Sequence, residues 1–220
     1  MLNERITTLK KNLIEFAGII ESMLNKSMKG LQKKDKTLLQ EVMEKDEPRA
    51  NHLEVEIDDL CTTTIAQFQP RAKDLRTVLM ILKMNNDLER MGDHAVNIAE
   101  SGIFLVERPQ VKELIDIPKM SEAAAQMLKD SIDSFINENP SLAQTVCERD
   151  NIVDELREKT IKELSAVMAS DPAAIDRSLH LLRISGNLER IADLSTNICE
   201  DVLFMVSGRV VKHHLEEENK

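Results

Sequence analysis

The sequence DLERMGDHAVNIAE at residues 87–100 occurs a second time, as NLERIADLSTNICE at residues 187–200, one hundred positions later. Seven of the fourteen positions are identical, and several of the others hold pairs of similar residues. A match at a fixed offset within one chain indicates a duplicated unit. The chain is therefore expected to consist of two similar halves, placed here at residues 1–109 and 110–220.

The amino-acid composition favours helices over strands. The chain has no Trp or Tyr, only five Phe, and six each of Gly and Pro among 220 residues. Aromatic residues are enriched in strands, whereas the Leu, Met, Ala, Glu and Lys that dominate this chain are good helix formers. A hydrophobic content of 42% with 31% charged residues is that of a water-soluble globular protein.

Apolar residues recur every three or four positions between short breaks, a pattern that predicts amphipathic helices. Six long helices are expected, at about residues 1–29, 36–69, 71–107, 111–137, 141–169 and 172–206. Gly30 and the Lys-Lys-Asp run at residues 33–35 are expected to end the first, and Asp35 and Asp171 or Ser170 to cap the starts of the second and sixth. Pro48 predicts a kink near Asp46–Pro48, because proline removes one helical hydrogen bond. The predicted fold is all-α, with two tandem, pseudo-symmetric three-helix bundles.

Charge and cysteine usage limit the classes of partner and the compartment. The formal net charge of −10 argues against nucleic acid and anionic membrane surfaces as partners. Cys61, Cys147 and Cys199 are far apart, which favours reduced, buried thiols in the cytoplasm. No apolar run approaches the roughly 18 residues that a membrane span needs. A cytoplasmic protein without a transmembrane segment is expected, at most peripheral to the membrane through its partners.

The repeated motif carries paired carboxylates. Glu89 and Asp93 lie one helical turn apart, as do Glu189 and Asp193, and both pairs interrupt an otherwise apolar stripe. Partly buried carboxylates need cationic partners. Two alternatives stay open: a structural ion-pair network with Arg and Lys side chains, or bound metal ions, for which carboxylate pairs are suitable ligands.

The second helix of each half offers further oxygens. Glu-Lys-Asp at residues 44–46 resembles Glu-Arg-Asp at residues 148–150, so Asp46 and Asp150 are candidate ligands. His94 has no counterpart in the second half, and we expect it to make an inter-helix hydrogen bond rather than to bind metal. The chain lacks the Glu-x-x-His pairs of di-iron bundles and any phosphate-binding loop, so no enzymatic activity is expected.

The doubled pattern Leu-Glu-Arg-[Met/Ile]-[Gly/Ala]-Asp-x-x-x-Asn-Ile-x-Glu, with Asp-Leu-Arg at residues 74–76, resembles the PhoU family along essentially the whole chain. Members are accessory and regulatory proteins of bacterial phosphate-specific transport. The resemblance implies a homodimer that represses the phosphate-starvation response. It would link the phosphate ABC transporter, through its ATPase subunit, to the phosphate-sensing histidine kinase. The alternatives are a metal-free helical adapter of a phosphate transporter and a carboxylate-bridged metalloenzyme.

The resemblance also implies transition metals, iron or zinc, held as a multinuclear cluster by the Glu-x-x-x-Asp motifs. Here these would be Glu89 with Asp93 and Glu189 with Asp193, supported by Asp46, Asp150 and Asp154. Two departures stand out: Pro48 lies where a family helix usually continues, and Ala50 or Asn51 occupies the first-half position that corresponds to Asp154. The first site is therefore expected to have one carboxylate fewer than the second.

Overall fold

The computed structural model describes residues 1–208, and all regular secondary structure in that range is helical. The first half contains α1 (Leu2–Lys33), α2 (Lys36–Glu41), a π-helical segment (Val42–Asp46), α3 (Glu47–Phe68) and α4 (Ala72–Val106). The second half contains α5 (Asp116–Ile136), α6 (Pro140–Glu148), α7 (Asp150–Ser170), a 3₁₀ turn (Pro172–Ala174) and α8 (Ile175–Ser207). The predicted all-α fold of six long helices is confirmed, with the second and fifth each divided in two.

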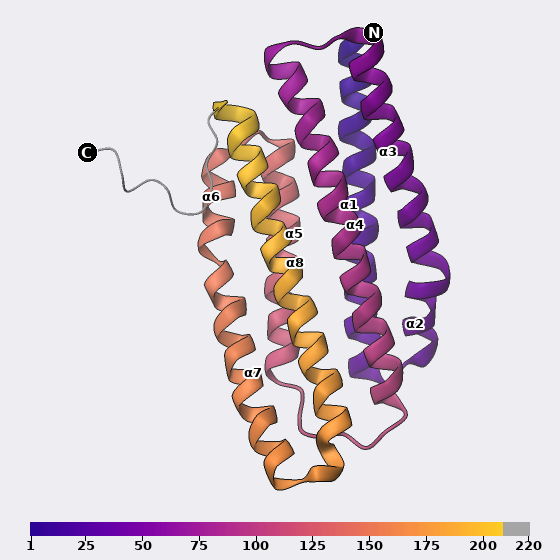
Figure 1. Cartoon of the computed structure of the whole chain (residues 1–220), viewed down its shortest axis with the longest axis vertical. Coiled ribbons are helices and arrows are strands. Elements are labelled where there is room, and N and C mark those ends of the chain that lie inside the picture. The colour runs from indigo at the N-terminus through magenta and orange to yellow at the C-terminus, as the bar shows by residue number, and fades with distance from the viewer. Residues whose placement is uncertain (209–220) are drawn as a thin grey trace, which may run out of the picture.

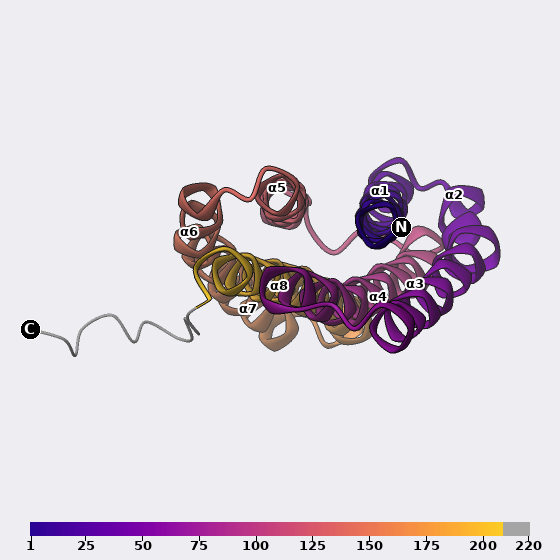
Figure 2. The same cartoon turned by 90° about the horizontal axis from the view of Figure 1, so that it is seen from above.

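The two halves meet along α4 and α8, which run antiparallel at the centre of the molecule (Figure 1). Helices α7, α8, α4 and α3 lie side by side in one layer, with α5 and α1 packed behind them (Figure 2). Lys83 forms an ion pair with Asp201, and Arg183 forms one with Glu100 at 2.9 Å. The two ion pairs are nearly equivalent: at an offset of one hundred, Lys83 corresponds to Arg183, and Asp201 corresponds to the residue next to Glu100. The halves are thus related by an approximate two-fold axis.

One continuous apolar core runs through both halves. Structurally equivalent residues of α1 and α5 are 104 positions apart in the sequence, as in the buried pairs Leu24 and Leu128 or Ser27 and Ser131. Each bundle buries the apolar stripe that its sequence predicts. The three-helix unit is therefore the repeated element of the fold.

The π-helical segment adds one residue to the first half. Before it, equivalent residues differ by 104: Asp35 and Asn139 each cap a helix by accepting a hydrogen bond from the third N–H group after them, at 3.1 and 3.2 Å. After it, they differ by 103, as in the buried pairs Ile57 with Thr160 and Cys61 with Leu164. A π-helical turn is how a helix accommodates one extra residue. It immediately precedes Pro48, where the sequence predicts a kink.

Three helix boundaries differ from the sequence prediction. Gly30 does not end α1, which continues to Lys33, at the start of the run of residues 33–35 that was also expected to end it. A Cβ at Gly30 would lie 2.6 Å from Cγ of Leu39, so the glycine instead allows α2 to pack closely against α1. The helix expected over residues 111–137 begins only at Asp116, which places Pro118 in its first turn, where no helical hydrogen bond is lost. The helix expected over 141–169 is broken at Arg149.

The remaining boundaries follow the sequence. The side chain of Asp171 accepts a hydrogen bond from the N–H of Ala173, as expected of a cap. The expected division between the halves, at residues 109 and 110, falls in the segment that joins α4 to α5, and residues 209–220 of the second range lie outside the described residues. Within the described chain, no helix is long and apolar enough to span a membrane.

Candidate functional site: two acidic clusters

The first acidic cluster combines Glu89 and Asp93 of α4 with Glu47 and Glu54 of α3. Burial raises the pKa of Glu47, and the charges of Asp93 and Glu100 raise it further. Burial likewise raises the pKa of Glu89, with added repulsion from Asp93 and Glu54. These four carboxylates are close enough to repel one another. We call them the first cluster.

No cation neutralises the motif carboxylates of the first cluster at close range. Among residues 1–208, no Lys or Arg nitrogen lies within ion-pair distance of Glu89 or Asp93. Arg90, the nearest in sequence, pairs instead with Asp87 at 3.5 Å. Arg90 also lowers the pKa of Glu89, but as the smallest contribution, and the first cluster has no ion pair within the described residues.

Asp46, a predicted member of the first site, lies elsewhere. Its Oδ2 is 2.7 Å from Nζ of Lys26, so its carboxylate turns towards α1. The reason is the extra residue of the π-helical segment, which rotates Asp46 out of the register of Asp150 and brings Glu47 into it. Glu47 faces Asp93 just as Asp150 faces Asp193.

The second acidic cluster contains Asp150 and Asp154 of α7 and Glu189 and Asp193 of α8. Burial raises the pKa of Asp150 to about 6, with further contributions from Asp193, Asp154 and Glu189. Oδ1 of Asp150 is buried and has no hydrogen-bond partner in the described part of the chain. All four sequence-predicted residues of this half are therefore brought together. We call them the second cluster.

Two arginines enter the second cluster. Arg157 of α7 lies 3.8 Å from Glu189, and Arg190 lies 3.7 Å from Glu189 and 3.1 Å from Asp193. Both lower the pKa of Glu189, against burial and the repulsion of Asp193. The second cluster is therefore partly neutralised by the chain itself, as the ion-pair alternative proposes.

Sequence reasoning missed Glu47, Glu54 and Arg157. At the offset of 103 that holds for α3 and α7, Glu54 is the counterpart of Arg157, and Asn51 is the counterpart of Asp154. The position equivalent to Asp154 does lack a carboxylate, but Glu54 supplies one at another position of the same helix. Each cluster therefore contains four carboxylates, and the expectation of one fewer in the first half is wrong. The available signal was the spacing of seven between Glu47 and Glu54, which places both on one helix face.

The donor chemistry of both clusters suits a hard or borderline cation, because carboxylate oxygens are the preferred ligands of such ions. Their geometry is open: in residues 1–208, no three His, Cys, Asp or Glu side chains are arranged so that they could hold one metal ion. A bound metal would therefore need carboxylates to rotate towards it. The first cluster, with unpaired charge, fits such an ion better than the second, in which two guanidinium groups already contact the carboxylates.

His94 makes the inter-helix contact that its sequence context predicts. Its Nδ1 lies 2.8 Å from Oδ1 of Asn187, so α4 and α8 are joined across the boundary between the halves. An amide oxygen only accepts hydrogen bonds, so Nδ1 must carry the proton. His94 therefore has a structural partner.

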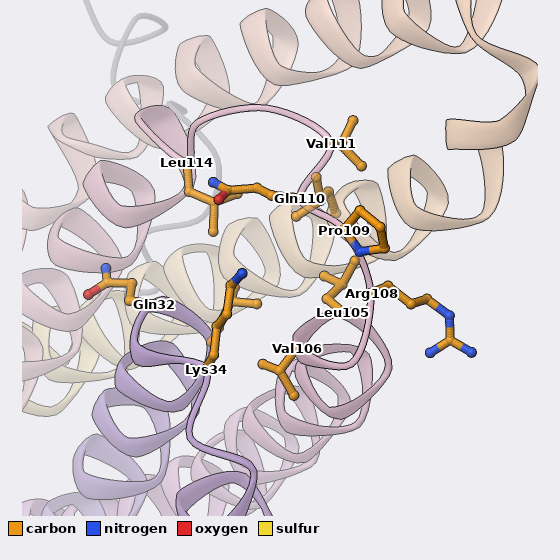
Figure 3. A pocket seen from close by; sticks show the side chains of 11 residues that line it. Gln32, Lys34, Leu105, Val106, Arg108, Pro109, Gln110, Val111 and Leu114 are labelled. Carbon is orange, nitrogen blue, oxygen red and sulfur yellow. The ribbon is translucent and has the colours of Figure 1, made fainter.

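A pocket lies away from the clusters, where the segment joining the halves crosses the end of the first bundle (Figure 3). Its wall is mainly apolar, and Arg108 points away from the other labelled side chains (Figure 3). The lining includes Leu31, Leu105, Val106, Pro109, Val111 and Leu181. No residue of either acidic cluster lines it. It is therefore separate from the candidate site.

Fold and clusters together define a class: tandem antiparallel three-helix bundles, each with an acidic cluster between its second and third helices. A family model described as the PhoU domain matches residues 13–102 and 117–202. The chain belongs to the PhoU family.

Individual relatives agree with that membership. The chain is 38% identical to the phosphate-specific transport system accessory protein PhoU homolog of Aquifex aeolicus, over 100% of this chain and 99% of that protein. It is 35% identical to PhoU homolog 2 of Thermotoga maritima, over 99% and 92% of the two chains. The crystal structure of PhoU from Pseudomonas aeruginosa superposes with a TM-score of 0.91 at 31% identity, covering 95% of this chain and all of that one.

Proposed function

We propose that this protein is an accessory and regulatory protein of a phosphate transport system, acting in the cytoplasm. The observation that supports this most directly is similarity along the whole chain to proteins named as accessory proteins of phosphate-specific transport. These names describe accessory rather than catalytic roles. An adapter function also suits the architecture, since each of the two helical bundles carries an acidic cluster and the sequence contains neither a phosphate-binding loop nor Glu-x-x-His pairs.

Repression of the phosphate-starvation response is the proposed role in the cell. The protein would act as a homodimer that links the ATPase subunit of the phosphate ABC transporter to the phosphate-sensing histidine kinase. Acidic clusters on adjacent helices favour partners with basic surfaces, because complementary charge steers association. Each half would act as one docking unit of the adapter.

A reporter of the phosphate-starvation response tests this role. In a bacterial host whose own gene of this family is deleted, expression of this chain should lower the reporter signal in phosphate-rich medium. A variant with Glu47→Lys and Glu89→Lys should fold and fail to lower it, whereas exchanges of solvent-exposed lysines far from the clusters should still do so. An unchanged reporter with well-expressed parent protein would contradict the proposal.

Metal binding at the clusters is part of the proposal, with iron or zinc as the candidate ions. The first cluster would hold the ion through Glu47, Glu54, Glu89 and Asp93, and the metal would supply the positive charge that these carboxylates lack. Elemental analysis of untagged protein should give stoichiometric metal, and Glu89→Gln/Asp93→Asn should remove more of it than Glu189→Gln/Asp193→Asn. Metal-free protein after reconstitution would leave the metal-free adapter, which the arginines of the second cluster already favour.

A further inference from the structure

The end of the molecule at which α1 and α4 stop carries a concentration of positive charge. Residues 29–36 contain four lysines and one aspartate, in a chain whose formal net charge is −10. Lys36 forms an ion pair with Glu107 at 2.5 Å. The other three lysines are exposed, and within residues 1–208 none of them has a carboxylate at ion-pair distance. We call these three the basic patch: Lys29, Lys33 and Lys34.

The opposite end of the molecule shows which contact Lys34 lacks. Lys34 corresponds to Glu138 at the offset of 104 that relates α1 to α5, and both have a left-handed backbone, with φ of 54° and 48°. Glu138 accepts hydrogen bonds from Nζ of Lys10 at 3.2 Å and from Nζ of Lys73 at 2.6 Å. In the sequence, at offsets of 104 and 100, uncharged residues replace these two lysines, namely Leu114 and Ala173. The ionic link of one end therefore has no counterpart at the other.

The backbone of Lys34 is unusual for a residue with a side chain. A left-handed residue at a helix end is most often glycine, because a Cβ costs free energy in that conformation. At Glu138 two ion pairs offset this cost. The side chain of Lys34 instead lines the pocket, with its amine directed towards the segment that carries Gln110 and Leu114 (Figure 3). Backbone strain of this kind often accompanies function, and here it places a cation at a pocket.

The pocket beside Lys34 is apolar and small. It lies between α1, α4, α8 and the segment that joins the halves, and its volume is about 60 Å³. One water molecule needs about 10–15 Å³ of such a cavity, so the pocket has room for a group the size of a leucine side chain. Its apolar wall consists of Leu31, Leu105, Val106, Pro109, Val111, Leu114 and Leu181.

The segment that closes the pocket is held in place by the second half. Arg177 of α8 donates a hydrogen bond to the carbonyl oxygen of Pro109 at 2.8 Å. Three residues further along the segment, Lys112 forms an ion pair with Glu163 of α7. The pocket is therefore preformed, which reduces the entropy lost when a ligand binds.

Charge and size together indicate what kind of ligand fits. The basic patch extends over roughly 7 Å along the helix axis, from Lys29 to Lys34, so it suits a ligand with more than one carboxylate. A fatty acid carries only one carboxylate, and its acyl chain is longer than the pocket. A peptide with one apolar side chain between Asp and Glu residues matches both the pocket and the patch.

We propose that the pocket and the basic patch form a docking site for an acidic segment of a protein partner. One apolar side chain of the segment enters the pocket, and the neighbouring carboxylates contact Lys34 and the rest of the patch. Because α1, α4 and α8 all line the pocket, the bound segment contacts both halves. The site is opposite in charge to the acidic clusters and separate from them, so it goes beyond the proposed accessory function.

Labelled peptides test the proposal on the full-length protein. The probes are fluorescein-labelled Asp-Glu-X-Asp-Glu peptides with Leu, Ile, Val, Met or Phe at X, in about 0.1 M salt to screen distant acidic groups. At least one should give saturable fluorescence polarisation and shift the methyl NMR signals of Leu114 and Leu181. Alanine at X should weaken binding at least about tenfold, because the apolar anchor is lost. No saturable binding by any probe, or equal binding with alanine at X, would overturn the proposal.

Two variants separate the cation from the pocket. Lys34→Asn removes the charge, keeps a residue that tolerates the left-handed backbone, and should weaken binding about threefold. Val111→Phe should fill the pocket and weaken binding at least about tenfold. Lys11→Gln, at an exposed lysine near the other end of α1, is the matched control and should bind like the parent. Circular dichroism checks that each variant is folded, and the alanine peptide tests the anchor on the unaltered protein.

Other occupants of the pocket give distinct results. Sodium decanoate, or vesicles containing phosphatidylglycerol, would have to displace the labelled peptide at lower concentration than any unlabelled peptide does. Such displacement would assign the site to lipid and overturn the proposal. Peptide binding that both Lys34→Asn and Val111→Phe leave unchanged would place the peptide elsewhere and overturn it as well.

Discussion

The two acidic clusters occupy equivalent places on nearly equivalent backbones, yet their charge is balanced differently. The second contains Arg157, which contacts Glu189, and Arg190, which contacts both Glu189 and Asp193. The first has Glu54 where the second has Arg157, and Arg90 turns to Asp87. The fold fixes the positions of the carboxylates, and two local differences, Glu54 in place of Arg157 and the pairing of Arg90 with Asp87, leave the first cluster without the ion pairs of the second.

Reversing the charge of Arg157 should have the largest effect. Arg157→Glu adds a carboxylate beside Glu189 and removes its partner, so the free energy of unfolding should fall by about 2 kcal/mol, less than for a fully buried pair because the arginine is partly exposed. Urea unfolding at low salt measures it. Arg157→Gln should lower the free energy of unfolding by about half as much, and added salt should reduce the difference between the Glu and Gln variants. Equal losses for Glu and Gln would show that the arginine acts through packing.

The packing of α2 offers the next comparison. Gly30 and Leu39 in the first half correspond to Ser134 and Ala143 in the second. Gly30 faces a large residue, whereas the equivalent positions of the second half both hold small, buried residues. Gly30→Ala should lower the free energy of unfolding by about 1–2 kcal/mol, because overpacking outweighs its helix propensity. Ser134→Ala should cost less. Leu39→Ala leaves a cavity of its own, so the contact is identified by a double-mutant cycle: Gly30→Ala should cost less in a Leu39→Ala background than in the parent when thermal unfolding of all four proteins is compared.

Asp150 and Asp46 share a sequence context but should respond to substitution with opposite sign. The pKa of Asp150 is raised from 3.8 to about 6, so its favourable contribution to folding is present below about pH 4 and lost as the pH rises through 6. Asp150→Asn should therefore stabilise by about 1 kcal/mol at pH 7, after discount for partial exposure, and by little at pH 4. Asp46→Asn loses the ion pair with Lys26 and should destabilise by up to about 1 kcal/mol at pH 7. Chemical unfolding at pH 4 and pH 7 measures the change in unfolding free energy for each variant. A change of the same sign for both variants at pH 7 would contradict the repulsive surroundings of Asp150 or the ion pair of Asp46.

The smallest expected effect is a gain from making the first cluster resemble the second. Glu54→Arg places a cation beside Glu89 and should raise the free energy of unfolding by about 0.5 kcal/mol at low salt. Glu54→Gln, which only removes repulsion, should gain less. Both variants should also bind divalent metal more weakly than the parent. Unchanged metal affinity in Glu54→Arg would exclude Glu54 from the proposed ligands.

Much of the fold follows from local sequence signals. The duplicated motif at an offset of one hundred predicts two halves, and caps such as Asp35 and Asp171 mark helix starts by their side-chain chemistry. The carboxylates of the second cluster were predicted correctly, because the residues that the sequence motif selects also lie together in the structure. In the first half they do not. Asp46 aligns with Asp150 in sequence, but one extra residue places Glu47 at the structurally equivalent position. A one-residue insertion leaves the hydrophobic pattern nearly intact, so periodicity does not reveal it.

The breaks within the second and fifth helices were harder to predict for another reason. Pro48 is a local signal and marks the first break, whereas the sequence around Arg149 contains no proline or glycine. α6 and α7 both pack against α8 on either side of that break, and such tertiary contacts are not encoded in single-sequence patterns. Gly30 was misjudged in the same way, because the close approach of Leu39 is a tertiary contact.

The antiparallel meeting of α4 and α8 means that one polypeptide imitates a symmetric dimer. In a true homodimer, any substitution appears at both equivalent places, so a carboxylate gained in one cluster is gained in the other. Here the equivalent places are encoded separately, and mutation can act on each alone. Glu54 can remain acidic while Arg157 is basic. Joining the copies in one chain thus gave the two surfaces independent evolutionary histories while they share a single hydrophobic core.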